Sequence, residues 1–168
     1  DDGSVLQGIL DDTRDGIRAR LDASLIIDPG TVLKFRGTRI ELGPGTQLLA
    51  EGTESQPIVF TSYADDRFGS GGTFDTNNDS DSPSGSLDPS PGDWSGIYAG
   101  SDSTVSFDHV TVAYGGGISL LEGGQSRGFA ALELRNADGR VTNSRFEFND
   151  DAQDGSGPVD RFGRGIVT

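Results

Sequence analysis

The chain has 168 residues and a formal net charge of −14, so electrostatic repulsion should keep it away from nucleic acid and from anionic membrane surfaces. It contains no cysteine, which excludes disulfide bonds and thiol chemistry, and no apolar run long enough to cross a membrane as a helix. Twenty-six glycines beside only 32% hydrophobic residues favour many short strands joined by tight turns over helices.

Residues 1–24 carry the weakest pattern, because they are polar with only two short apolar clusters. The residues that follow predict stacked strands, and the end of such a stack is otherwise an open sheet edge. We therefore predict an N-terminal cap over residues 1–24 and stacked coils over residues 25–168.

A repeat opens the coil region. The segment IIDPGTVLKFRGT at 26–38 returns fifteen residues later as ELGPGTQLLAEGT at 41–53, with its turn residues kept. Each copy predicts a short strand, a Pro-Gly turn, a second strand and a glycine corner. Such a unit cannot bury its own apolar face, so successive copies are expected to stack as a solenoid.

Stacked parallel strands lie about 4.8 Å apart, so equivalent residues of successive coils should form ladders. The repeat predicts Ile27 above Leu42 and Leu33 above Leu48. A further strand is expected over residues 57–62, where the alternation of Ile58 and Phe60 turns these side chains inward.

The apolar pattern stops after Tyr63 and resumes at Asp93 and Trp94, where a longer repeat begins. Residues 95–112 align with residues 130–148 if one residue is inserted before Arg140. This alignment pairs Ile97 with Leu132, Val105 with Val141, Val110 with Phe146 and Val112 with Phe148.

The alternation of apolar residues changes phase at Asp108-His109, which predicts a corner between two strands there. Glycine-rich excursions are expected at 115–128 and 150–161, and the final GRGIVT reads as the start of one more coil. The predicted fold is thus all-β, a right-handed parallel β-helix with long Asp/Gly-rich loop insertions. A β-sandwich is the alternative, with Asp138-Gly139 as its best hairpin signal.

The insertion at 65–93 holds seven aspartates and a single arginine. Within it, oxygen-bearing side chains alternate as D-x-N-x-D-x-D, the spacing with which a loop wraps around Ca²⁺. The loop departs from an EF-hand, because Ser80 replaces the glycine and no glutamate closes it. The predicted Ca²⁺ ligands are Asp75, Asn77, Asp79 and Asp81, with Asp65, Asp66 and Asp88 available to complete the shell.

The alternative for this insertion is a solvated polar loop that binds no ion. Mg²⁺ is less suitable because it demands octahedral geometry, and zinc is disfavoured with a single histidine and no cysteine. No catalytic residues are predicted, since His109 has no second histidine or cysteine to work with and is read as a corner residue. Trp94 is read as a packing residue.

Four stretches resemble the right-handed parallel β-helix repeat proteins of bacterial secreted and cell-surface giants, which are common in planctomycetes. They are ASLIIDPGTVLKF, LLAEGTESQPIVFTS, DTNNDSDS…PGDWSGIYAGSDS and LRNADGRVTNSRFEFN. The resemblance covers residues 25–168 and implies a long extracellular protein, of which this chain is a fragment. Members often carry a DD…DTNxD…PGDW stretch here, which supports the calcium loop.

We therefore expect a non-enzymatic, extracellular or cell-surface module, such as a stalk, fibre or adhesin segment, stabilised by Ca²⁺. Its expected partners are neighbouring coils or chains at the open β-helix ends, as in a homo-oligomer or fibre, and surface polysaccharide. The alternatives are a polysaccharide lyase, a glycoside hydrolase or a carbohydrate-binding module. A lyase needs a basic residue to take a proton from its substrate. The chain has Lys34 as its only lysine, which disfavours the lyase, and a fold alone does not imply an activity.

Overall fold

The computed structural model describes residues 23–69, 74–79, 88–120, 126–150 and 166–167. All regular structure within these ranges is β-strand. The expected all-β class is therefore confirmed for the described part of the chain. No helix there is long and apolar enough to span a bilayer.

Three parallel sheets of four strands each make up most of the structure. The first contains β1 (Ser24–Ile27), β4 (Gln47–Glu51), β7 (Thr104–Asp108) and β12 (Asp138–Thr142). The second contains β2 (Val32–Phe35), β5 (Ile58–Ser62), β8 (Val110–Ala113) and β13 (Arg145–Glu147). The third contains β3 (Ile40–Leu42), β6 (Ile97–Ala99), β11 (Leu132–Leu134) and β14 (Ile166–Val167).

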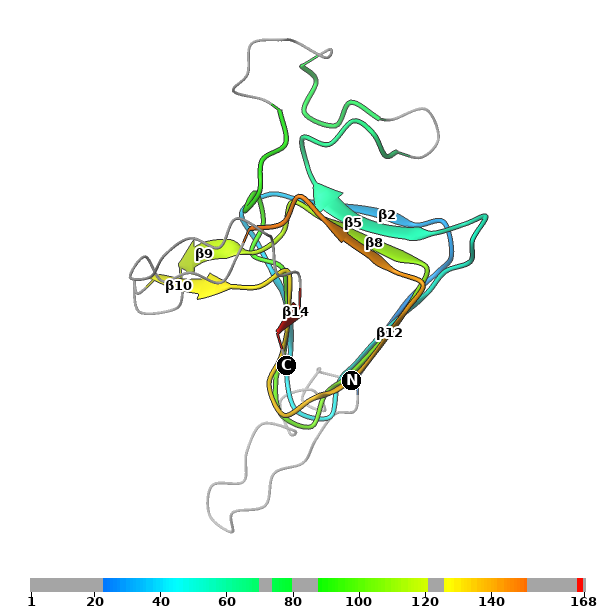
Figure 1. Cartoon of the computed structure of the whole chain (residues 1–168), viewed down its shortest axis with the longest axis vertical. Helices are drawn as coiled ribbons and strands as arrows, with labels where there is room; N and C mark the ends of the chain where they lie inside the picture. Colours follow the sequence, from blue (N-terminus) through cyan, green and yellow to red (C-terminus); the bar gives the residue numbers. More distant parts are fainter. Residues whose placement is uncertain (1–22, 70–73, 80–87, 121–125, 151–165, 168) are drawn as a thin grey trace, which may run out of the picture.

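The chain visits these sheets in rotation, so neighbours within a sheet come from different passes of the chain. Seen in Figure 1, the three sheets form the sides of a triangle. Every pairing inside them is parallel, which is compatible with a parallel β-helix. A β-sandwich does not fit, because sandwiches are built from antiparallel sheets.

The core consists of apolar side chains that the strands direct inward. All five residues of β5 are buried, and Ile58 and Phe60 belong to the core while Val59 between them does not, as the alternation over residues 57–62 predicts. Aromatic rings from successive passes stack, with centroids 5.7 Å apart for Phe60 and Phe107. At the end of the described chain β14 pairs in parallel with β11, which is compatible with the expected start of a further coil.

The predicted ladders of the short repeat are wrong. Ile27 lies opposite Ala50 rather than Leu42, and Leu33 lies opposite Phe60 rather than Leu48. The two copies occupy different corners of the triangle, because the second strand of one copy is β2 and that of the other is β4. The copies share a sequence because each of them turns a corner of the triangle. They do not stack on each other, because a strand stacks only on the strand that lies a full circuit of three strands away.

The longer repeat is right at its start and wrong further on. Ile97 pairs with Leu132 as predicted, but Val105 faces Gly139 and Val112 faces Phe146. At Val105 and Val112 the sequence separation between paired residues is one residue shorter than between Ile97 and Leu132, whereas the alignment made it one residue longer. Gly139 occupies the position opposite Val105, so there is no apolar side chain at this point to match.

The corner predicted at Asp108-His109 is confirmed. His109 has a φ of 50°, and Asn143, with a φ of 49°, turns the chain at the equivalent corner of the next pass. Left-handed backbone is tolerated by Asn and His better than by most residues. The side chain of Asn143 also donates to the Asp108 carboxylate at 2.9 Å, which ties the two corners together.

The first glycine-rich excursion contains an antiparallel hairpin formed by β9 (Gly117–Leu120) and β10 (Ser126–Phe129). It projects from the triangle beside the third sheet (Figure 1). Phe129 packs edge-on against Tyr98 and lies under the guanidinium of Arg39. The predicted cap at 1–24 and the excursion at 150–161 fall almost entirely outside the described residues.

Candidate metal site in the acidic loop

The acidic insertion leaves the second sheet after β5 and returns to the third sheet at β6. Figure 1 shows it standing out from one vertex of the triangle. Residues 65–69, 74–79 and 88–93 of this loop are described, so the predicted ligand Asp81 lies outside the described residues. The loop is therefore placed where two sheets meet, rather than along a sheet face.

Three of the predicted ligands come together. Carboxylate oxygens of Asp66, Asp75 and Asp79 lie within 4.8 Å of one another, and all three residues are half-buried. Like charges at this separation repel unless a cation or a proton intervenes. A set of carboxylate oxygens is the environment that hard divalent cations such as Ca²⁺ prefer.

The backbone curls around these carboxylates. Asn78 adopts a φ of 59°, which bends the chain between Asn77 and Asp79. The backbone N–H of Asp79 donates to Asp75 Oδ1 at 3.1 Å, and Asn77 Nδ2 donates to Asp79 Oδ2 at 2.7 Å. In this arrangement Asn77 supports Asp79 through its amide nitrogen.

The segment is also attached to the sheets. Lys34 on β2 donates its ammonium group to the carbonyl of Phe74, at the start of the described ligand segment. The only lysine of the chain thus forms a hydrogen bond that attaches the acidic loop to β2.

Asp65 has a different role from Asp66. It is completely buried and accepts hydrogen bonds from Thr61 Oγ1 at 2.5 Å and from Arg67 Nε at 2.9 Å. Burial by itself raises the pKa of Asp65, but the hydrogen bonds from Arg67 and Thr61 outweigh it and hold that pKa below its usual range. Asp65 is thus a charged anchor of the loop and stands apart from the carboxylate cluster.

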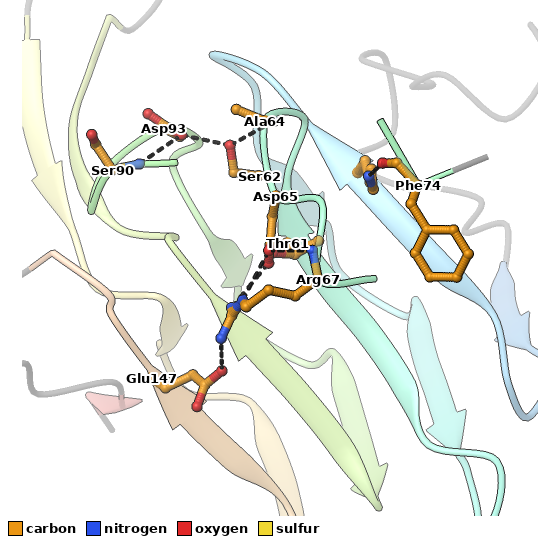
Figure 2. A network of polar contacts seen from close by, with 10 residues as sticks. Thr61, Ser62, Ala64, Asp65, Arg67, Phe74, Ser90, Asp93 and Glu147 are labelled. Atoms are coloured by element: carbon orange, nitrogen blue, oxygen red, sulfur yellow. Dashed lines mark hydrogen bonds and ion pairs between the residues drawn. The ribbon is translucent and has the colours of Figure 1, made fainter. Parts of the chain in front are cut away.

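Arg67 connects this anchor to a distant strand. Its Nη1 donates to Glu147 Oε1 at 2.8 Å, on β13 and 80 residues further along the chain (Figure 2). The guanidinium also lies about 5 Å from the ring centroids of Phe68, Tyr114 and Phe148. We call this contact between Arg67 and Glu147 the latch. It was not predicted, because nothing in the sequence near Arg67 indicates its partner.

A second attachment closes the loop at its far end. Asp93 Oδ2 accepts from Ser62 Oγ at 2.5 Å and from the backbone N–H of Ser90 at 3.0 Å (Figure 2). The next residue, Trp94, is fully buried and stacks on Phe35 with ring centroids 4.6 Å apart. Its indole N–H donates to the Ala113 carbonyl at 2.9 Å, so the packing role predicted for Trp94 is confirmed.

The remaining candidates lie elsewhere. Asp88 is exposed and lines a cavity beside the loop, outside the carboxylate cluster. His109 Nδ1 lies 3.1 Å from Asp108 Oδ1 at its surface corner.

No family model matches this chain, and no curated protein or solved structure matches it either.

Proposed function

We propose that the chain is a segment of a right-handed parallel β-helix with a structural or adhesive, non-enzymatic role, and that Ca²⁺ bound in the acidic loop stabilises it. The observation that carries the proposal is the cluster of Asp66, Asp75 and Asp79, whose carboxylate oxygens lie within 4.8 Å of one another. The rotation of the chain through three parallel sheets supports the β-helix, the architecture in which such a circuit repeats.

Calcium suits this cluster better than other common cations. It accepts irregular shells of six to eight oxygen ligands, whereas Mg²⁺ requires a nearly ideal octahedron. Backbone carbonyls and water can supply the oxygens that three carboxylates leave open. Extracellular calcium modules work with dissociation constants of about 10⁻⁴ to 10⁻³ M, so a modest site is sufficient outside the cell.

The proposed role of the ion is mechanical. Arg67 joins the start of the loop to β13, and Asp93 joins its end to β5. An ion between Asp66, Asp75 and Asp79 would fix the middle of the loop relative to both attachments. It would thereby stabilise the arrangement of successive passes of the chain. This fits a secreted or cell-surface stalk, fibre or adhesin segment that contacts neighbouring coils or chains and surface polysaccharide.

The test is thermal unfolding and calorimetric titration with CaCl₂ and with a chelator. Binding to the native state alone adds about 2.7 kcal/mol at a hundredfold excess over the dissociation constant, so calcium should raise the melting temperature. Asp79→Asn should abolish most of this gain. Glu54→Gln, an exposed acid on a turn outside the loop, is the matched control and should respond as the wild type does.

Identical melting curves with calcium and with chelator, together with no heat of binding, would overturn the metal site. Such a result would leave the β-helix assignment standing, because the sheets are built without the loop's carboxylates.

A further inference from the structure

A partly open cavity of about 300 Å³ lies where the acidic loop joins the sheets. This volume is at the lower end of the roughly 300 to 1,000 Å³ typical of small-molecule sites, and so suits a ligand about one ring in size. The polar side chains that line it are Arg36, Ser62, Tyr63, Asn77, Asp88 and Asp93.

Hydrogen bonds join three of the chain segments that line the cavity. The backbone N–H of Tyr63 donates to the Phe35 carbonyl at 2.7 Å, and that of Gly37 donates to the Asp93 carbonyl at 2.7 Å. The side chain of Ser62 donates to Asp93, as Figure 2 shows. These bonds fix the Asp93 side chain and the backbone on either side of Arg36 before any ligand arrives, which lowers the entropic cost of binding.

The lining contains both hydrogen-bond donors and acceptors. Arg36 follows β2, is exposed, and forms no ion pair with another residue that the structure describes. Its guanidinium offers only donors, whereas the carboxylate of Asp88 offers only acceptors. Asn77 carries both kinds of group, and Tyr63 adds an aromatic ring with a hydroxyl.

This pattern selects a ligand by charge. An anion would meet Asp88, Asp93 and the neighbouring three-carboxylate cluster, while a cation would meet Arg36. A neutral ring bearing several hydroxyls can both donate to the carboxylate and accept from the guanidinium, and its C–H face can lie on an aromatic ring.

We propose that this cavity binds one neutral sugar ring of a glycan. Arg36 and Asp88 hydrogen-bond its hydroxyls, and Tyr63 supplies the apolar surface. The proposal gives a site to the polysaccharide contact named above and rests on that part of the proposed function. It does not require the metal ion, since neither Arg36 nor Tyr63 belongs to the carboxylate cluster.

The test is an NMR titration of the ¹⁵N-labelled chain with the methyl glycosides of glucose, galactose and mannose. Methyl glucuronide serves as the anionic probe and glucosamine as the cationic one. At least one neutral glycoside should shift the amide signals of Tyr63, Asp88 and Asp93 in a saturable manner. Arg36→Ala should weaken this binding at least tenfold, because it removes a charged hydrogen-bond donor.

Arg140→Ala, at another exposed arginine, on β12, is the control and should bind as the wild type does. Each titration is run with calcium and with chelator, and the loss caused by Arg36→Ala should appear in both, which separates this proposal from the metal site. The proposal is overturned if no neutral glycoside binds, if a charged probe binds more tightly than every neutral one, or if Arg36→Ala has no effect.

Discussion

The sheets and the acidic loop are ordered by different forces. Inside the triangle, residues such as Phe60, Phe107 and Val112 are fully buried, and their burial together with parallel backbone pairing holds the strands. In the loop the described attachments are polar, from Asp65 and Arg67 at one end to Asp93 at the other. The sheets should therefore tolerate changes of pH and ions that loosen the loop, and the following predictions test this contrast.

The largest effect is expected in the sheets. Phe60→Asp places an unpaired carboxylate in a fully buried position, at a cost of roughly several kcal/mol, and should prevent folding. Ile26→Asp is the control, because this strand residue is 67% exposed and should tolerate the change. Circular dichroism and thermal melting provide the measurement, and wild-type stability of Phe60→Asp would mean that the inward face of β5 is misassigned.

The next effect is expected at the junction of the two regions. Trp94→Ala removes a buried ring that stacks on Phe35 and donates to Ala113, and should cost about 3 to 5 kcal/mol. Trp94→Phe keeps most of the stacking surface, loses the hydrogen bond, and should fall between the wild type and Trp94→Ala. Denaturant unfolding measures both, and equal stability of the three proteins would contradict the junction role.

A smaller loss is expected at the latch. Arg67→Met leaves the buried Asp65 without its main partner, and should cost about 2 kcal/mol once the solvent exposure of Arg67 is taken into account. Limited proteolysis should then cleave near the loop first, with β7 and β8 still protected. Arg140→Met, at an exposed arginine on β12 that pairs with Glu51 rather than with Glu147, is the matched control. Uniform loss of protection across the chain would argue against separable regions.

The smallest effect concerns acid. The pKa of Asp65 lies below its ordinary value of 3.8, so its contribution to stability is present above that pH and is lost as the pH falls through the lower folded-state value. Asp65→Asn should be less stable at neutral pH and should lose less stability than the wild type below about pH 4. Melting temperatures across this range provide the check, and parallel curves for the two proteins would contradict it.

Part of the fold follows from short stretches of sequence. Alternating apolar residues identified β5 and the inward direction of Ile58 and Phe60, because a strand's alternation is a local property. The D-x-N-x-D spacing likewise predicted that Asp75 and Asp79 would lie close together, because they belong to one tight turn of chain.

Tertiary structure decided the partnerships across long separations. Ile27 lies beside Ala50 instead of Leu42. Asp65 binds Arg67, whereas its neighbour Asp66 belongs to the carboxylate cluster. Glu147, on a distant strand, forms an ion pair with Arg67 of the loop. These outcomes depend on how many residues close each circuit of three strands, and that number differs between circuits because of the insertions. Local patterns specify which side chains face inward, but only the closed circuit determines which residues meet.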